Sequence, residues 1–222
     1  MMKRVGMITI GQSPRVDVVP EVMALVDTPM EVVEAGALDG LNLDEVRRMA
    51  PGPNDETLVT RMADGTGVHV AKRHIIPRLQ SCIDHLAPRV EVVVLLCTGI
   101  FPEFHSSVPV LEPQRLVDRV VQAVVSPGGQ VGLMIPAAAQ AQASRRKMEE
   151  YGLVARVAVA SPYGRFEEVR HAAATFRDSD VKAVVMHCIG YDAKMKAEVR
   201  QQSGKPVILA RSVVGKILEE ML

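Results

Sequence analysis

Short apolar runs alternate with helical patterns along the whole chain. The apolar runs have the length of strands, and the run at 90–96 is apolar on both faces, which is typical of a central strand in a parallel sheet. We expect strands at about 5–10, 30–35, 90–96, 108–111, 131–135, 154–160, 183–187 and 207–210. We expect helices at about 13–27, 42–49, 74–86, 112–125, 138–151, 164–177, 192–202 and 212–221. The alternation predicts an α/β protein.

Two local signals refine this pattern. Ser13 followed by Pro14 predicts the start of the first helix, with a serine cap and a proline at the first helical position. Residues 58–62 and 67–71 flank a turn that contains Asp64-Gly65, and Asp-Gly between two extended runs is typical of a hairpin. The hairpin is therefore an antiparallel insertion in an otherwise alternating chain.

The two halves of the chain contain similar segments. Residues 5–7 resemble residues 131–133, and residues 92–99 resemble residues 183–190, each of the second pair ending in Cys-X-Gly. The spacing between the segments is longer in the first half, where the hairpin lies. We therefore expect two similar parallel-sheet lobes, the first with a β-hairpin insertion. The alternative is coincidence, because valine-rich strands and glycine turns recur in any α/β protein.

Composition narrows the possible partners. The 222 residues carry 26 basic and 26 acidic side chains, four Phe, three Tyr and no Trp, whereas nucleic acids and membrane surfaces attract a positive excess. The three cysteines have no short spacing, so we expect neither disulfides nor a zinc site. No run is long enough to span a bilayer, and we expect no signal peptide. These features predict a cytoplasmic protein without nucleic-acid or membrane partners.

The two Cys-X-Gly turns are the strongest candidates for chemistry. Ligands of open parallel sheets bind beyond the carboxyl ends of the strands, where Cys97 and Cys188 lie. One thiolate could remove the α-proton of a bound carbon acid while the second thiol protonates the opposite face. We therefore predict Cys97 and Cys188 as catalytic acid and base. The alternative is that they are small buried hydrophobic residues, which is what we expect of Cys82.

Several neighbouring residues are candidates for holding an anion. Gly99 and Gly190 let the backbone approach a ligand closely, and Arg15 binds either a carboxylate or another protein side chain. Tyr191 reaches the substrate or packs its loop, and His187 is expected to lie in the core rather than act as a base. No metal cluster or glycine-rich phosphate loop is present, so we expect no metal and no cofactor.

Motifs spread over most of the chain resemble the AroM family. These motifs are Thr9-Ile10-Gly11-Gln12-Ser13-Pro14-Arg15, Gly36-Ala37-Leu38-Asp39-Gly40-Leu41, Leu58-Val59-Thr60-Arg61, Leu95-Leu96-Cys97-Thr98-Gly99 with Phe101-Pro102, Ser161-Pro162-Tyr163 and Cys188-Ile189-Gly190-Tyr191. The resemblance to AroM proteins by itself implies no particular reaction.

The two-cysteine layout is more distantly similar to the aspartate, glutamate and hydantoin racemase superfamily. That resemblance implies a cofactor-independent, two-lobed protein with one catalytic cysteine in each lobe, at Cys97 and Cys188. It also implies that a small carboxylate is held between the lobes. It implies Gly11, Gln12, Ser13 and Thr98 as substrate-binding residues, and Arg15, Gly99, Gly190 and Tyr191 complete the predicted set. Ile189 departs from the pattern, because a threonine commonly stands there and its hydroxyl would bind the carboxylate.

The superfamily resemblance also gives a domain division. It implies a first lobe of residues 1–112 plus 206–222, a second lobe of residues 113–205, a site in the interlobe cleft and a homodimer. Two functional hypotheses follow. The protein is either a racemase, isomerase or decarboxylase of a small carboxylate, or a regulatory protein that binds such a metabolite without turnover.

Overall fold

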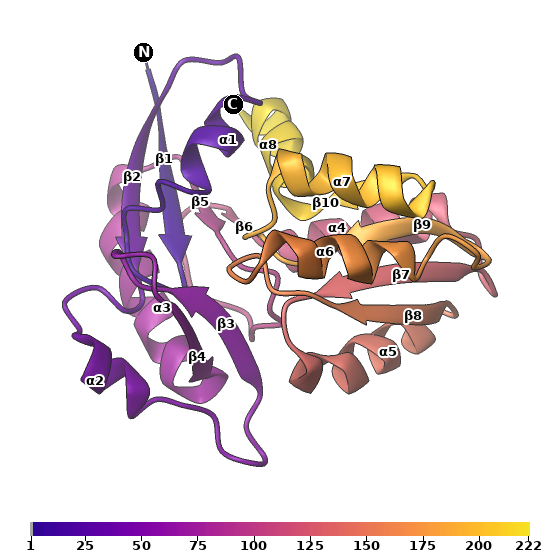
Figure 1. Cartoon of the computed structure of the whole chain (residues 1–222). Coiled ribbons are helices and arrows are strands. Elements are labelled where there is room, and N and C mark those ends of the chain that lie inside the picture. Colours follow the sequence, from indigo (N-terminus) through magenta and orange to yellow (C-terminus); the bar gives the residue numbers. More distant parts are fainter. Residues whose placement is uncertain (1) are drawn as a thin grey trace. The chain divides into compact units, whose positions relative to one another are not determined.

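The computed structural model describes residues 2–222 and confirms the expected architecture (Figure 1). Two four-stranded sheets, each entirely parallel, are accompanied by one antiparallel hairpin. Contacts divide the chain into a first unit, Met1–Gln114 with Val214–Leu222, and a second unit, Arg115–Val213. Each unit contains one of the parallel sheets and its own hydrophobic core.

The first unit is built on the sheet β2-β1-β5-β6. Its elements are β1 (Lys3–Thr9), α1 (Val19–Met23), β2 (Met30–Gly36), α2 (Leu43–Arg47), β3 (Thr57–Arg61), β4 (Gly67–Ala71), α3 (Lys72–Leu86), η1 (Ala87–Arg89), β5 (Val92–Leu95) and β6 (Val110–Leu111). An apolar stripe of α3 packs on one face of the sheet, as its sequence period predicts. Gly6 of β1 permits this close packing, since a Cβ there would lie 3.3 Å from Leu86 Cδ1.

The hairpin insertion is confirmed as the antiparallel pair β3 and β4. The Met62 N–H donates to the Thr66 carbonyl at 2.8 Å, and Gly65 supplies the positive φ of 92° that the turn requires. Leu58 and Val70 pair across the hairpin and are buried in the same core as α3. The insertion is therefore an integral part of the first unit.

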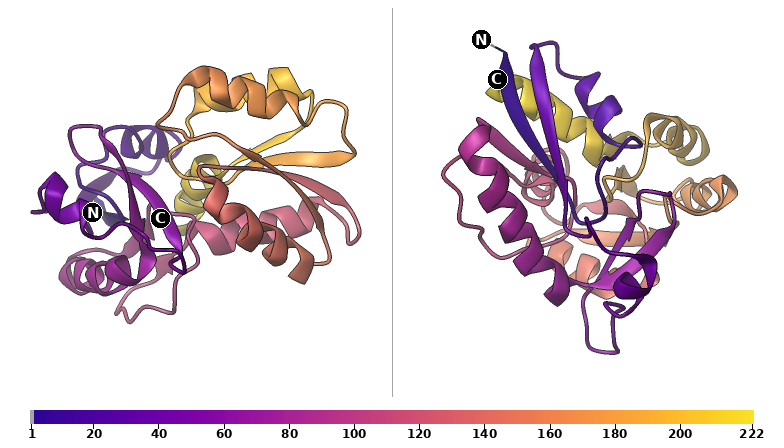
Figure 2. Two further views of the ribbon diagram at one scale, coloured as in Figure 1. Left: turned by 60° about the horizontal axis from the view of Figure 1, so that its bottom comes forward. Right: turned by 90° about the vertical axis from the view of Figure 1, so that its left-hand side faces the viewer.

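The second unit is built on the sheet β10-β9-β7-β8. Its elements are α4 (Pro113–Val124, beginning in the first unit), β7 (Gln130–Ile135), η2 (Ala138–Gln140), α5 (Ala141–Glu150), β8 (Val154–Val159), α6 (Phe166–Ala174), β9 (Val181–Met186), α7 (Ala193–Ser203), β10 (Val207–Leu209) and α8 (Ala210–Met221, which ends in the first unit). Residues of α6 and α7 cover one face of this sheet, and residues of α4 and α5 cover the other (Figure 2).

The two sheets have the same topology. In chain order, β1, β2, β5 and β6 of the first sheet occupy the positions of β7, β8, β9 and β10 in the second. A single helix, α6, connects β8 to β9, whereas α2, the hairpin and α3 connect β2 to β5. The repeated segments of the sequence thus correspond to repeated strands, and the insertion lies where the spacing predicted it.

Two expectations differ from the structure. The first helix begins at Val19 rather than at Ser13, because Ser13 bonds to Asp39 and caps no helix, so the predicted cap is wrong. The expected first lobe includes residues 206–222, but β10 pairs in parallel with β9 and so lies in the second sheet. Only from Val214 does the tail belong to the first unit, where Glu219 accepts hydrogen bonds from the N–H groups of residues 27 and 28.

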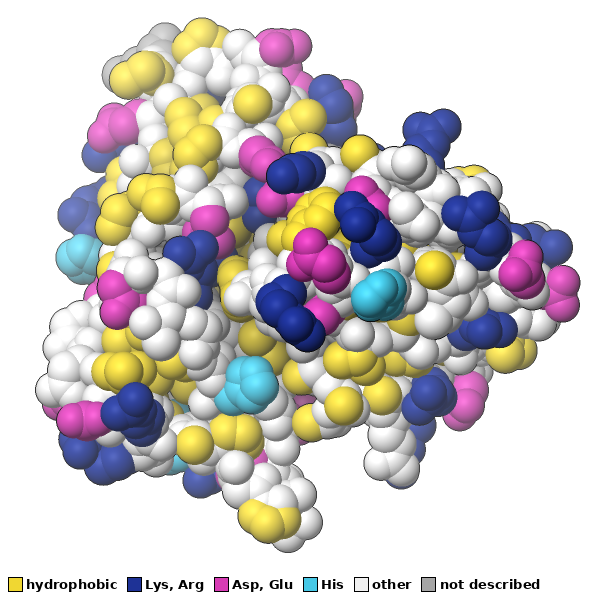
Figure 3. All heavy atoms as spheres, viewed as in Figure 1, with side chains coloured by type: hydrophobic (Ala, Val, Ile, Leu, Met, Phe, Trp, Pro, Cys, Tyr) yellow, Lys and Arg dark blue, Asp and Glu magenta, His cyan; other side chains and the backbone are white. Residues whose placement is uncertain are grey.

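Surface chemistry agrees with the balanced composition. Basic and acidic side chains are interspersed on the face shown in Figure 3.

Within residues 2–222, no helix combines the length and apolar character needed to cross a membrane. In the same part of the chain, no group of three or more His, Cys, Asp or Glu side chains is placed to hold a metal ion.

Removing the ring of Phe176 should destabilise the second unit. This side chain is fully buried, and its ring packs on Gly132 of β7. We expect Phe176→Ala to reduce the free energy of unfolding by about 3–5 kcal/mol in urea titrations, because the lost contacts leave a cavity. Phe166→Ala, at a half-buried position on α6, serves as the matched control and should cost less than half as much. Equal losses would contradict the assigned core.

Candidate functional site

The two cysteines follow equivalent strands in equivalent ways. The Leu96 N–H donates to the Ile8 carbonyl at 2.7 Å, and the His187 N–H donates to the Met134 carbonyl at 2.9 Å. Each bond extends the pairing of a central strand with the first strand of its sheet by one residue. Each cysteine is therefore the first residue beyond the paired strand, at the carboxyl edge where ligands of parallel sheets bind.

The backbone of each turn is directed at its own sulfur. The Gly99 N–H donates to Cys97 Sγ at 3.2 Å, and the Gly190 N–H donates to Cys188 Sγ at 3.4 Å. A donated hydrogen bond favours the charged thiolate over the thiol. The sequence predicts that these glycines let a ligand approach the backbone. In the structure their N–H groups donate hydrogen bonds to the cysteine sulfur atoms.

Both turns require glycine at this position. A Cβ on Gly99 would lie 3.0 Å from the ring of Phe101, and one on Gly190 would lie 2.6 Å from Tyr163 Oη. These distances are shorter than van der Waals contact. The Cys-X-Gly motif therefore reflects packing against the following or neighbouring loop as well as the bond to sulfur.

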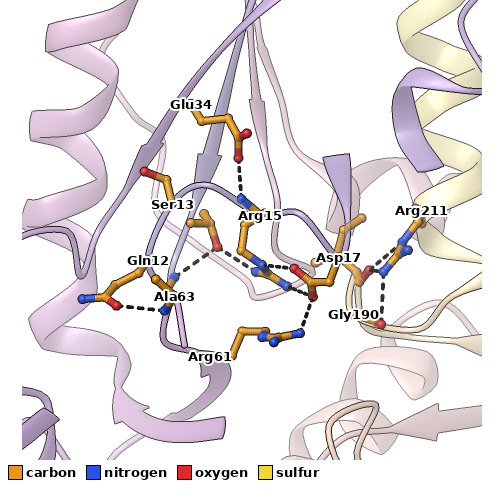
Figure 4. A network of polar contacts seen from close by, with 12 residues as sticks. Gln12, Ser13, Arg15, Asp17, Glu34, Arg61, Ala63, Gly190 and Arg211 are labelled. Carbon is orange, nitrogen blue, oxygen red and sulfur yellow. Dashed lines mark hydrogen bonds and ion pairs between the residues drawn. The ribbon is translucent and has the colours of Figure 1, made fainter. Parts of the chain in front are cut away.

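The second turn has a charged neighbour that the sequence did not reveal. Arg211, at the start of α8, donates from Nε and Nη2 to the Ile189 carbonyl at 3.1 and 3.0 Å, and from Nη2 to the Gly190 carbonyl at 3.1 Å (Figure 4). The side chain of Arg211 is only 1% exposed. A buried guanidinium thus holds the two carbonyl groups that follow Cys188.

Tyr191 packs beneath the second turn. Its side chain is fully buried, and its hydroxyl donates to the Ala160 carbonyl. Burial raises the pKa of Tyr191 well above its usual value, and the proximity of Cys188 and Tyr163 raises it further. The structure gives Tyr191 this packing role, and its contact with a substrate stays a prediction.

The first loop is tied to the hairpin. The Gln12 N–H donates to the Arg61 carbonyl at 3.2 Å, and the Ala63 N–H donates to Gln12 Oε1 at 2.9 Å. The Gln12 side-chain amide also donates to the carbonyls of Leu38 and Leu41. Gly11 has no room for a side chain, because a Cβ would collide with the Arg61 carbonyl. Gln12 therefore connects three segments of the first unit.

Ser13 and Asp39 connect two of the motifs noted in the sequence. Asp39 accepts hydrogen bonds from the Ser13 N–H at 2.8 Å, the Ser13 hydroxyl at 2.6 Å and the Gly36 N–H at 2.8 Å. The carboxylate thus fixes the loop after β1 against the turn after β2. Binding of substrate by Gln12 or Ser13 stays a prediction, and in the structure both side chains bond within the protein.

Arg15 is buried and forms an ion pair with the partly exposed carboxylate of Asp17. Its guanidinium donates to both carboxylate oxygens of Asp17 at 2.8 Å and to the hydroxyl of Thr9 at 2.8 Å, while Arg61 Nη1 lies 3.4 Å from Asp17 (Figure 4). Burial alone would raise the pKa of Asp17, but Arg15 and Arg61 outweigh it and hold that pKa below its usual value. Arg15 therefore organises the loop, and its role as a substrate ligand stays a prediction.

Sequence reasoning missed four residues around the predicted site: Asp17, Asp39, Arg61 and Arg211. Asp39 and Arg61 lie within motifs that carried the family resemblance, so their positions were noted without a role. The roles of Asp17 and Arg211 cannot be predicted from a motif in the sequence, because each contacts residues that come close to it only when the chain folds.

The remaining cysteine and the histidine beside Cys188 behave as core residues. Burial, with the Asp39 carboxylate nearby, raises the pKa of Cys82 to about 11. Burial lowers the pKa of His187; Asp118 opposes this and Lys147 reinforces it. Val185 and Cys188 belong to clusters on opposite faces of the sheet, so strand alternation directs His187 away from the cysteine face.

A family model described as "AroM protein" matches residues 5–222. The chain belongs to the AroM family. The match confirms the resemblance read from the motifs, and it spans both cysteine turns of this AroM protein.

Solved structures with the same fold include several enzymes that are distant in sequence. The maleate isomerase Iso from Pseudomonas putida S16 has a TM-score of 0.67 and 14% identity, covering 100% of this chain and 93% of its own. Glutamate racemase from Francisella tularensis has a TM-score of 0.65 and 13% identity, covering 99% and 81%. Arylmalonate decarboxylase has a TM-score of 0.60 and 14% identity, covering 99% and 92%. No curated protein matches the chain at a significant level. At these identities the likeness establishes the racemase-like fold.

The depressed pKa of His187 predicts acid sensitivity in a defined range. The unfolded chain binds this proton near pH 6.5, whereas the folded chain binds it only at lower pH. We therefore expect the contribution of neutral His187 to the free energy of unfolding to be present above about pH 6.5 and to decrease as the pH falls below that value. His187→Gln should flatten the dependence of unfolding free energy on pH between about 7 and 5. The exposed control His85→Gln should keep the wild-type slope; if His187→Gln kept it too, the assignment would be wrong.

Proposed function

We propose that this AroM protein catalyses cofactor-independent acid–base chemistry at the α-carbon of a small carboxylate. The reaction class is racemisation, isomerisation or decarboxylation, with Cys97 and Cys188 as the acid and base. The observation that carries the proposal is the matched pair of turns, in each of which a glycine N–H donates to a cysteine sulfur at the carboxyl edge of a parallel sheet.

The chemistry requires one thiolate and one thiol. A thiolate removes the proton from the α-carbon, the electrons move into the adjacent carboxylate to give an enediolate-like species, and the second thiol returns a proton to the opposite face. In decarboxylation the carbon–carbon bond to the departing carboxylate supplies the electrons, and a thiol protonates the resulting carbanion. Both routes need donors at the remaining carboxylate, where charge accumulates.

The carboxylate contacts are proposed to be unequal. Thr98 follows the first cysteine and carries a hydroxyl, whereas Ile189 follows the second and carries none. The Ile189 carbonyl is held by Arg211. We therefore assign the hydroxyl contact with the substrate carboxylate to Thr98.

The substrate class is inferred from chemistry and from the fold. The similar structures are named as enzymes of glutamate, maleate and arylmalonate, all small carboxylates. The proposal includes a cytoplasmic location, supported by three cysteines, all in the described part of the chain, that form no disulfide. A homodimer stays a prediction.

Isotope exchange tests the proposal directly. The protein is incubated in D₂O with a panel of amino, hydroxy and dicarboxylic acids that includes malonic acids, and deuterium at the α-carbon of each acid or of its decarboxylation product is measured by NMR. We expect at least one acid to exchange, and Cys97→Ser and Cys188→Ser each to reduce the rate by about a hundredfold or more, the scale of general acid–base catalysis. Cys82→Ser is the matched control and should retain exchange.

The rival function gives a different result. A regulatory protein that binds a carboxylate without turnover would show ligand-induced thermal shifts that survive both serine substitutions, with no exchange for any acid. Exchange that persists in either serine variant would remove the two-thiol mechanism. It would leave one-cysteine chemistry, of the kind that decarboxylation requires.

The mechanism also requires both thiols to reach a single bound molecule. A short bis-electrophile should therefore join Cys97 and Cys188 in a Cys82→Ser chain, giving one intramolecular product by mass spectrometry. A competing carboxylate that supports exchange should slow this cross-link. Separate alkylation of the two cysteines, with no bridged product, would contradict a shared site.

A further inference from the structure

Arg211 contacts the peptide groups of the second cysteine turn and is not among the residues proposed to bind the substrate. Its guanidinium reaches the Ile189 carbonyl through two N–H groups and the Gly190 carbonyl through one (Figure 4). It is held in the interior of the fold, since its side chain is only 1% exposed. A fork that engages two successive carbonyls fixes the orientation of both peptide planes.

The peptide bond between Ile189 and Gly190 links this guanidinium to the sulfur of Cys188. The only cis peptide bond in residues 2–222 is Ser13–Pro14, so the bond between residues 189 and 190 is trans. In a trans peptide the C=O and N–H groups point in opposite directions. Arg211 binds the oxygen end of this peptide, and the Gly190 N–H at the other end donates to Cys188 Sγ at 3.4 Å.

This arrangement places a positive charge, a peptide dipole and a sulfur in series. A cation at the carbonyl oxygen polarises the peptide and strengthens the hydrogen bond that its N–H donates. Arginine keeps its charge at every relevant pH, and the effect is larger in the interior because solvent screening is weak. Cys188 is itself only 7% exposed. The series therefore favours negative charge on the sulfur.

We propose that Arg211 is a positioning residue that stabilises the Cys188 thiolate through the Ile189–Gly190 peptide. Its catalytic use rests on the proposed function, but its effect on the thiol needs no substrate. Other titratable groups near the turn are Tyr191, Tyr163 from the loop that packs on Gly190, and His187 and Asp192, which flank the turn in sequence. The two tyrosines are neutral phenols until they ionise, and Arg211 is a cation whose guanidinium contacts the carbonyls of the turn.

The test measures thiolate formation at Cys188 directly. In a Cys82→Ala, Cys97→Ser chain, the ultraviolet absorbance of the thiolate is followed against pH, so access of a reagent to a buried sulfur does not matter. Arg211→Met should move the midpoint upward by about one pH unit, a tenfold loss of thiolate below the midpoint. Arg211→Lys keeps the charge but not the planar fork, so it should give a smaller upward shift.

A matched control separates this effect from general destabilisation. Ser203 is also buried in the second unit, and its hydroxyl bonds to the Val199 carbonyl at 2.6 Å, away from the cysteine turn. Ser203→Ala should lower the unfolding temperature and leave the Cys188 midpoint unchanged. In a companion Cys82→Ala, Cys188→Ser chain, Arg211→Met should leave the midpoint of Cys97 unchanged.

The outcomes distinguish this proposal from the proposed function. An unchanged Cys188 midpoint in folded Arg211→Met overturns the positioning role, as does an equal shift in Ser203→Ala. If Arg211→Met does not fold, Arg211→Lys carries the test, and an unchanged midpoint in that variant overturns the role. A shifted midpoint in a protein that exchanges no carboxylate would retain the Arg211 role and reject the catalytic proposal.

Discussion

Parallel pairing of a central strand with the first strand of each unit fixes where the cysteine turns lie. Pairing runs through Leu95 opposite Ile8 in the first sheet and through Met186 opposite Met134 in the second, and it ends just before each cysteine. Beyond that point the backbone no longer pairs with a neighbouring strand, so its N–H groups can donate hydrogen bonds to a side chain. Both units use this freedom to direct a glycine N–H at a sulfur.

Buried arginines organise the loops at these edges. Arg15 is 2% exposed and Arg211 is 1% exposed, and each is held by hydrogen bonds to protein oxygens. A guanidinium buried without such partners would be strongly unfavourable. Arg15 is neutralised by the carboxylate of Asp17, whereas the contacts that join Arg211 to its turn are with neutral carbonyl groups. At that turn, the charge of Arg211 acts on peptide dipoles rather than on a carboxylate.

The sequence was sufficient to predict the features that depend on local pattern. Valine-rich runs gave the parallel strands, Asp64-Gly65 gave the hairpin, and the repeated Cys-X-Gly gave the two equivalent turns. The local pattern at Ser13 predicts a helix cap, and this prediction is wrong. The serine instead donates hydrogen bonds to the carboxylate of Asp39, which is distant in sequence. Both residues appeared in the motifs, but nothing in either motif states that they meet.

The site itself was predictable only in part, for the same physical reason. Each cysteine lies two residues before its glycine, so the hydrogen bond between them is a local feature of the turn. Arg211 lies more than twenty residues beyond the turn it holds, and Asp17 is joined to Arg61 of the hairpin. Such contacts arise when separate elements pack together, and no periodicity or spacing encodes them.

The two turns share a backbone design but differ in chemistry, and the difference suits the proposed reaction. Thr98 and the equivalent Ile189 are both buried, but Thr98 carries a hydroxyl beside Cys97, whereas Ile189 carries none and its carbonyl accepts a hydrogen bond from Arg211 beside Cys188. A two-thiol mechanism needs one sulfur charged and the other protonated at the same moment. The proposed reaction would take that distinction from Arg211, which donates hydrogen bonds to the carbonyls of the Cys188 turn. On this proposal, the unequal neighbours of two equivalent turns would assign one cysteine as the base and the other as the acid.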